Sequence, residues 1–217
     1  MDNLFIMQLF RDPVFFFMIA LIVSFSICLH EYFHAFAAYC LGDSTAAEQG
    51  HLTLNPLKQM GWMSLLMFAV AGIAWGAVPV GPEVRNKRWK SMIVSFAGPL
   101  ANLCLLAVSW VLFGLLLHFP GLQEEGGPES RIALFFFYFG VYNTVLFLLN
   151  LIPAPGFDGW WIFTSLFPVR RMLNSEFQKG LFVFLIFLVF AVSGYLFKAG
   201  SYVMTLAPAV FGLFIPS

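Results

Sequence analysis

Charged side chains are scarce in this chain of 217 residues, where they make up 10% of the sequence. A typical soluble domain carries about 25% charged residues. Hydrophobic residues account for 60% of the chain, and the mean hydropathy is +0.86. The shortage of charge excludes an ordinary soluble domain and predicts that lipid surrounds most of the chain.

Three further absences exclude other classes of protein. Eleven basic residues balance eleven acidic ones, so there is no basic excess to attract nucleic acid. Cys28, Cys40 and Cys104 form no CxxC pair, and their odd number argues against a disulfide framework, so we read them as small apolar residues in helices. The N-terminus lacks the basic region with which a cleavable signal peptide begins.

Long apolar runs are what the sequence contains instead. A helix needs about 20 predominantly apolar residues to cross a bilayer. Such runs predict membrane spans at residues 14–41, 91–117, 132–152 and 181–197, and the shorter run at 202–215 either spans or lies in the interface. We therefore expect an all-α polytopic membrane protein with about four to six transmembrane helices, folded as a single membrane-embedded domain over residues 1–217.

The apolar segment at residues 61–80 follows a different pattern. Three residues that disfavour a continuous helix interrupt it, Gly72, Gly76 and Pro79. Basic residues flank it, Lys58 before and Arg85 after, as expected for a segment with both ends in the cytoplasm. We expect this segment to be re-entrant or otherwise non-spanning, and to border the path of a substrate.

The distribution of basic residues orients the chain in the membrane. The segments at residues 43–90 and 168–179 together hold eight lysines and arginines, whereas the opposite side holds three. Lysine and arginine concentrate in cytoplasmic loops. This rule places both segments in the cytoplasm and the N-terminus outside.

The motif His30-Glu31-Tyr32-Phe33-His34 supplies the first candidate functional residues. Residues i and i+4 share one face of a helix, so both imidazoles can bind one metal ion, and Glu31 beside them can take a proton from water. Ionisable residues inside a spanning helix are functional by default. At 1.5 Å per residue, His30 lies roughly 25 Å below residue 14, near the cytoplasmic face. An interfacial polar cluster that only ends the span is the alternative.

A catalytic zinc ion needs a third protein ligand beyond the two histidines. Asp158 follows the third span, where a segment with two prolines and a glycine breaks the helix. Broken backbone at membrane depth occurs where it is buried in protein or lines a cavity. Two crossings after the first span also return the chain to the depth of the histidines. Two alternatives remain: His51 as the ligand, and Asp158 as the N-cap of a helix over residues 159–167.

Two amide side chains lie in apolar spans, Asn102 in the second and Asn150 at the end of the third. Either amide can form a hydrogen bond to a neighbouring helix, worth about 0.6–2 kcal/mol. The functional alternative is that the amide positions a substrate or stabilises an oxyanion.

Three features, in this order, resemble the site-2 protease family of intramembrane zinc metalloproteases, peptidase family M50. They are HExxH in a spanning helix, Gly98-Pro99-Leu-Ala-Asn102 at the head of a later span, and the Asn150…Pro153-x-Pro155…Asp158-Gly159 element. The segment Asn55-Pro56-Leu57-Lys58 is similar to one in small bacterial members. The resemblance covers roughly residues 14–165.

The resemblance implies an enzyme that hydrolyses peptide bonds in or near transmembrane segments of membrane-protein substrates, in a bacterial inner membrane. It implies one Zn²⁺ per chain held by His30, His34 and Asp158, with Glu31 catalytic and Asn150 holding the substrate or its oxyanion. The catalytic core would cover about residues 14–165, followed by accessory C-terminal helices over about 180–215.

The chain departs from the family pattern in two respects. Trp160 stands where members commonly have a second glycine after Asp-Gly. No stretch is long enough for the PDZ or CBS domain that some members carry. A metal-binding transporter or a non-catalytic scaffold is the rival interpretation, but a transporter is expected to show paired repeats, and the sequence has none. The substrate's identity and the oligomeric state stay open.

Overall fold

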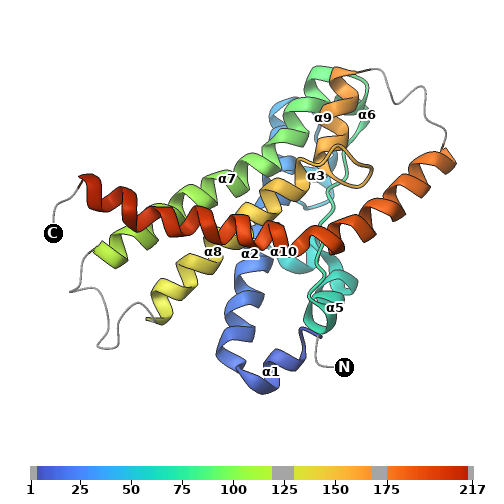
Figure 1. Ribbon diagram of the computed structural model, residues 1–217. Helices are drawn as coiled ribbons and strands as arrows, with labels where there is room; N and C mark the ends of the chain where they lie inside the picture. The colour runs from blue at the N-terminus through green and yellow to red at the C-terminus, as the bar shows by residue number, and fades with distance from the viewer. Residues whose placement is uncertain (1–3, 119–129, 168–174, 215–217) are drawn as a thin grey trace.

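The computed structural model describes residues 4–118, 130–167 and 175–214, and no strand occurs within these ranges (Figure 1). The helices are α1 (Met7–Arg11), α2 (Pro13–Cys40), α3 (Thr45–Glu48), α4 (Pro56–Gln59), α5 (Gly61–Ala71), α6 (Pro82–Arg85), α7 (Arg88–His118), α8 (Arg131–Asn150), α9 (Asp158–Leu166) and α10 (Ser175–Phe214). The basic residues Arg170 and Arg171, which count toward the predicted charge asymmetry, lie outside the described residues.

Four helices of the described part are long and apolar enough to cross a membrane. The candidate spans are Pro13–Cys40, Arg88–His118, Arg131–Asn150 and Phe187–Val210. Large apolar side chains such as Phe17 and Leu21 of α2 face outward, where lipid rather than water is their solvent. The predicted all-α polytopic membrane fold is therefore confirmed.

The first span begins and ends where the sequence predicts. Pro13 occupies the first helical position, and the Asp12 carboxylate accepts a hydrogen bond from the Phe15 N–H at 3.0 Å. The helix ends at Cys40, and Gly42 follows with a φ of +87°. Glycine has no Cβ to oppose this left-handed conformation, so the chain can leave the helix axis here.

The segment at residues 61–80 does not cross the membrane. Helix α5 has 11 residues, which span about 16 Å, roughly half the thickness of the hydrocarbon core. Gly72 then turns the chain with a φ of +75°, and an extended segment returns. The Ala77 N–H donates to the Gln59 carbonyl at 3.1 Å, so the segment comes back to the point where α5 began. The predicted non-spanning segment is confirmed.

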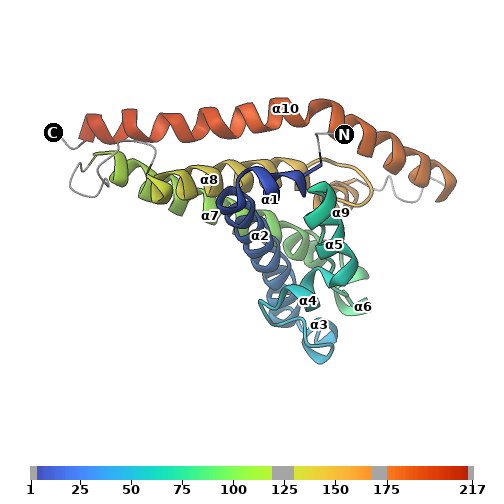
Figure 2. The same cartoon turned by 90° about the horizontal axis from the view of Figure 1, so that it is seen from below.

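Apolar packing fixes α2 between α5 and α8. Ile19 and Ile22 of α2 are buried in one cluster with Phe68 of α5 and Phe139 of α8. Helix α10 lies across α7 and α8, on the side away from α3 and α4 (Figure 2). The helices that carry the candidate site are thus enclosed by neighbours on several sides.

The apolar runs at residues 181–197 and 202–215, which the sequence analysis treats as separate, belong to a single helix of 40 residues, α10. Gly200 packs closely on α8, where an added Cβ would lie 2.9 Å from the Val141 carbonyl oxygen. Met204 packs in the same way against Gly140. The glycine therefore permits close contact between two helices instead of ending one, and Pro208 lies inside the helix.

Candidate metal centre

Helices α2 and α7 meet at the HExxH motif. His30 and His34 lie one turn apart on α2, and both are buried. Gly98 of α7 lies directly against their rings, where an added Cβ would collide with both imidazoles. A glycine is required at this position because any side chain would occupy the space in front of the two Nε2 atoms.

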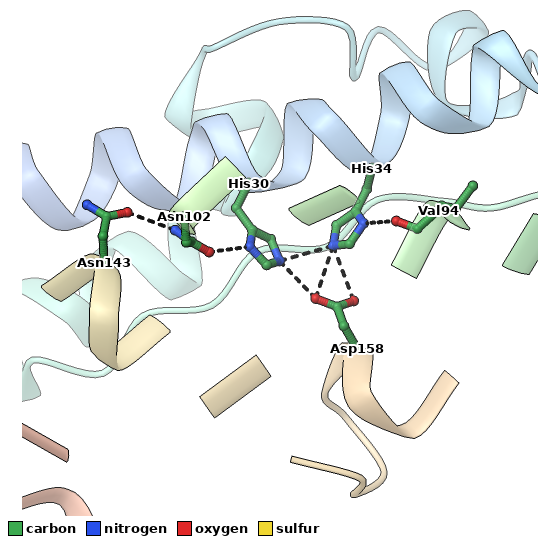
Figure 3. Close-up of polar contacts among 6 residues, drawn as sticks. All are labelled: His30, His34, Val94, Asn102, Asn143 and Asp158. Carbon is green, nitrogen blue, oxygen red and sulfur yellow. Dashed lines mark hydrogen bonds and ion pairs between the residues drawn. The ribbon is translucent and has the colours of Figure 1, made fainter. Parts of the chain in front are cut away.

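Asp158 completes a cluster of three side chains, although it is 124 residues from His34 in the sequence (Figure 3). The Nε2 atoms of His30 and His34 are 3.0 Å apart. One carboxylate oxygen of Asp158 lies 3.0 Å from His30 Nε2, and the other lies 3.2 Å from His34 Nε2. Three potential ligand atoms from two distant parts of the chain therefore converge on one point.

The opposite nitrogens of both histidines face oxygen acceptors. His34 Nδ1 lies 2.7 Å from the Val94 carbonyl oxygen, and His30 Nδ1 lies 2.7 Å from Asn102 Oδ1. A carbonyl oxygen can only accept, so each Nδ1 carries a proton, and in the neutral form of each ring the lone pair is on Nε2. Two lone pairs and the Asp158 carboxylate then face one another, an arrangement that a cation stabilises.

The donor set fits zinc. Two histidine nitrogens and one carboxylate are ligands that catalytic zinc sites use. Donor atoms that share a tetrahedral zinc ion at about 2.0–2.2 Å lie roughly 3.3–3.6 Å apart. The separations of 3.0–3.2 Å among His30, His34 and Asp158 come within a few tenths of an ångström of that range.

The turn after α8 aims Asp158 at the histidines. Gly156 adopts a φ of +97°, and Gly159 packs against the Leu151 carbonyl at the end of α8. Asp158 is the first residue of α9, whose N-cap is Phe157, and no side chain caps this helix. The N-cap alternative for Asp158 is therefore wrong. Trp160, which stands where a second glycine is common, is buried. It is not among the residues that line the cavity around the candidate ligands, whereas its neighbour Trp161 is.

Asp158 presents both of its carboxyl oxygens to the two ring nitrogens, at 3.0 Å from His30 Nε2 and 3.2 Å from His34 Nε2. The carboxylate is the form in which this side chain can bind a metal ion.

Glu31 and Asn150 line the same cavity as the three candidate ligands. The cavity has a volume of about 430 Å³. Glu31 is buried, and the Gly76 backbone lies so close that an added Cβ there would collide with the Glu31 carboxylate. The Asn150 side chain has no hydrogen-bond partner among the described residues. Its amide is therefore available to a molecule in the cavity.

Residues 72–81 form an extended wall of the cavity, and polar side chains anchor it. Ser64 of α5 accepts a hydrogen bond from the Trp75 N–H at 2.9 Å and donates one to the Trp75 carbonyl at 2.7 Å. The Asp43 carboxylate accepts from the Gly81 N–H at 2.6 Å. The wall is thus fixed on both sides of Gly76, the residue that faces Glu31.

Asp43 is a buried anchor whose charge is stabilised locally. Burial acts to raise its pKa, but hydrogen bonds from Thr45 and from the Gly81 N–H, together with the nearby Arg85, hold the pKa below its usual range. Asp43 therefore stays ionised and keeps accepting hydrogen bonds at neutral pH.

The other two residues left open by the sequence differ in position. His51 lies outside the donor cluster, with its Nδ1 3.3 Å from Gln59 Oε1, and Gln59 in turn donates to the His51 carbonyl. The alternative in which His51 is the third ligand is not supported by this position. Asn102 contacts both His30 and a second buried amide, Asn143.

Sequence reasoning missed several residues of the site. Asn143 carries the same signal as Asn102, an amide inside an apolar span, and could have been found in this way. Ser95 lines the cavity at 8% exposure, but a serine in a membrane helix gives little signal by itself. The Val94 carbonyl and the close approach of Gly76 are backbone features that no residue type reveals.

Comparison with known proteins finds one peptidase family and several proteins named as zinc metalloproteases. The family model described as Peptidase family M50 matches residues 122–192. "Putative zinc metalloprotease YwhC" of Bacillus subtilis (strain 168) is 38% identical over 181 residues, which cover 82% of this chain and 81% of that protein. No solved structure matches the chain.

Two mycobacterial proteins, both named "Putative zinc metalloprotease Rip2", are also similar. The protein of Mycolicibacterium smegmatis is 37% identical over 72% of this chain, and the match covers 57% of that protein. The protein of Mycobacterium tuberculosis (strain ATCC 25618 / H37Rv) is 30% identical over 79% of this chain and 67% of that protein.

Proposed function

Because this chain belongs to peptidase family M50, we propose that His30, His34 and Asp158 hold its zinc ion and that Glu31 is its catalytic acid and base. The family assignment drawn from the sequence is confirmed. The chain is an integral membrane zinc metalloprotease of the site-2 protease type. Its relatives give no support to the rival interpretation as a transporter or scaffold.

The residues present fit the zinc ion, and each has a defined part in holding it. When bound, zinc supplies a Lewis acid that activates water and polarises the peptide carbonyl. His30 and His34 offer Nε2 lone pairs because their Nδ1 protons are engaged by oxygen acceptors. The Asp158 carboxylate offers a negative charge from the opposite side of the cavity.

Glu31 is placed to transfer the proton that peptide hydrolysis requires. Its carboxylate takes a proton from the attacking water as the water oxygen bonds to the peptide carbonyl carbon. The same side chain then gives the proton to the amide nitrogen as the C–N bond breaks, so the products are a carboxylate and an amine. Gly76 lies directly against its side chain, and both residues line the cavity.

Asn150 supports the reaction by binding the substrate. Its amide lines the cavity and has no partner among the described residues. A side-chain N–H is a donor of the type that stabilises a developing oxyanion in a water-poor site. We assign Asn150 to the carbonyl oxygen of the peptide that is cleaved.

The substrate class follows from the depth of the cavity in the membrane. The cavity lies at the inner end of α2, a helix that is long and apolar enough to span a bilayer. A transmembrane helix satisfies its own backbone hydrogen bonds, so a substrate helix must unwind locally before Glu31 can act on a peptide bond. The substrates are therefore membrane proteins cleaved in or near a transmembrane segment.

We assign the cavity to the cytoplasmic side of a bacterial inner membrane. Basic residues concentrate in cytoplasmic segments, and the segment at residues 43–90, whose Arg85 lines the cavity, holds five of them: Lys58, Arg85, Lys87, Arg88 and Lys90. Single cysteines at positions 58 and 85, in a background without the native cysteines, should both react with an impermeant thiol reagent from the cytoplasmic face only. Reaction from opposite faces would contradict this topology.

The observation that carries the proposed function is the convergence of three acceptor side chains beside Glu31 in one cavity. Purified Glu31→Gln should keep its zinc but lose cleavage of a co-expressed membrane-protein substrate, because the amide keeps the shape of Glu31 without its basicity. His30→Ala should lose both zinc and cleavage. Cleavage by Glu31→Gln at the wild-type rate would refute the assigned role of Glu31.

A further inference from the structure

Three fully buried polar side chains are hydrogen-bonded to one another among the membrane-spanning helices, beyond the cluster of candidate ligands. They are Ser26 of α2, Asn102 of α7 and Asn143 of α8, and each has 0% of its surface exposed. A buried polar group costs free energy unless it is hydrogen-bonded, and the cost is large in a membrane. Three such residues on three different helices therefore call for an explanation.

Hydrogen bonds join these side chains into a chain that ends at His30, and Figure 3 shows its part from Asn143 through Asn102 to His30. Asn102 Nδ2 donates to Asn143 Oδ1 at 2.9 Å, and His30 Nδ1 lies 2.7 Å from Asn102 Oδ1. Asn143 Nδ2 donates to Ser26 Oγ at 3.0 Å and to the Phe139 carbonyl at 2.8 Å.

We propose that Asn143 and Ser26 are positioning residues, which act through Asn102 to hold His30 in the tautomer and orientation that bind zinc. The proposal rests on the proposed function, since it requires His30 to be a zinc ligand. It means that two further residues, on helices α8 and α2, determine how His30 faces the metal centre.

The direction of each hydrogen bond in the chain is fixed from its far end. The Phe139 carbonyl can only accept, so it requires the N–H₂ group of Asn143, and Asn143 Oδ1 must then face Asn102. That oxygen requires the N–H₂ group of Asn102, which turns Asn102 Oδ1 toward His30. The oxygen finally requires a proton on His30 Nδ1, and the lone pair is left on Nε2, where the metal binds.

The two histidines thus obtain the same tautomer by different routes. His34 donates directly to a backbone carbonyl, that of Val94, whose direction no side-chain substitution can reverse. His30 reaches the Phe139 carbonyl only through two amide side chains. If Asn143 were apolar, Asn102 could rotate its amide and present N–H to His30, which favours the tautomer that cannot bind zinc through Nε2.

Zinc affinity tests the proposal, with the dissociation constant measured by chelator competition on the purified full-length protein. Asn143→Leu and Asn102→Leu should each weaken zinc binding about 10–100-fold, the range expected when the partner of a metal-binding histidine is lost. Asn102→Asp keeps an oxygen acceptor for His30, so its affinity should stay closer to that of the wild type. Absorption of the cobalt-substituted protein should change in Asn143→Leu, because the His30 ligand is reoriented.

Thr144→Val is the matched control for Asn143→Leu. Thr144 is adjacent on α8 and 5% exposed, but its hydroxyl donates only to the Gly140 carbonyl of its own helix, at 2.9 Å. This variant should bind zinc as the wild type does. If Asn143→Leu and Thr144→Val lowered the melting temperature of the zinc-free protein alike and neither changed zinc affinity, Asn143 would be merely structural and the proposal would be overturned.

Two further variants keep the test decisive. If Asn143→Leu does not fold, Ser26→Ala removes a single hydroxyl and should still weaken zinc binding by about two- to fivefold, less than loss of the direct partner of a ligand; unchanged affinity would overturn the proposal. His30→Ala separates the two hypotheses. Zinc retained in His30→Ala would refute the proposed zinc site itself, whereas zinc lost in His30→Ala but unchanged in Asn143→Leu would refute only the positioning role.

Discussion

The cavity has two walls of opposite construction. The helical wall consists of α2, α7 and the end of α8, whose backbone hydrogen bonds are satisfied within each helix. The extended wall is residues 72–81, whose backbone is tied down by the side chains of Ser64 and Asp43 and by the Gln59 carbonyl. The helical wall carries two of the three candidate ligands, whereas the extended wall carries none and faces Glu31.

This difference teaches that holding the metal and shaping the space around the catalytic carboxylate are separate tasks. Helices fixed by apolar packing give His30 and His34 constant positions. The extended wall depends on a few polar anchors and sets how much room Glu31 has. Damage to the helical wall should therefore remove zinc, and damage to the extended wall should reduce cleavage while zinc stays bound.

Gly98→Ala should have the largest effect on zinc binding and cleavage, because it changes the helical wall where it contacts the two histidine ligands. The added Cβ would collide with both imidazole rings, and donor distances in a metal site must hold to within about 0.2 Å. Purified Gly98→Ala should retain less than about a tenth of the wild-type zinc, measured by elemental analysis, and should not cleave substrate. Gly194→Ala is the control, since no atom of the described residues lies within 4 Å of its added Cβ; equal zinc in both variants would contradict the prediction.

Gly76→Ala changes the extended wall instead. Its Cβ would collide with the Glu31 carboxylate, and a displacement of about 1 Å in a catalytic group can reduce the rate about 100-fold. We expect cleavage to fall by that factor while the zinc content equals that of the wild type. Loss of zinc in this variant would show that the two walls are not independent.

Ser64→Ala should have a smaller effect on the same wall. It leaves the Trp75 N–H and carbonyl without their partner, at a cost of about 1–3 kcal/mol for an unpaired buried group. Cleavage should fall about tenfold, again with zinc retained. Ser109→Ala is the control, because the one hydrogen bond of the Ser109 hydroxyl within the described residues goes to the Leu105 carbonyl of its own helix; an equal loss in both variants would argue against an anchoring role.

Asp43 should show the smallest effect, visible as a pH dependence of stability. Its pKa is lowered in the folded protein, so its stabilising contribution is present above the unfolded pKa of about 3.9 and is lost as pH falls through the folded pKa. The melting temperature of Asp43→Asn should therefore lie below that of the wild type at pH 7, and the gap should shrink below about pH 4. A gap that is constant with pH would mean that the charge of Asp43 does not stabilise the fold.

Much of the architecture was predictable because one physical rule, the cost of polar groups in lipid, acts along the whole chain. This rule correctly predicted the positions of the first three spans and predicted that the segment at residues 61–80 does not cross the membrane. It failed at α10, because a glycine that lets two helices touch looks the same in sequence as one that ends a helix. It also drew no attention to Asn143, although the same rule applies there.

The sequence by itself determined the solvent of the chain, the spacing that puts His30 and His34 on one helix face, and the broken backbone before Asp158. These are local properties, fixed by composition and helical period. Only the tertiary structure decided that Gly98 opens the space before the histidines, that Gly76 confines Glu31, and that Asn143 reaches His30 through Asn102. Such contacts join residues 41 to 72 positions apart, and they depend on how helices pack, which no local pattern encodes.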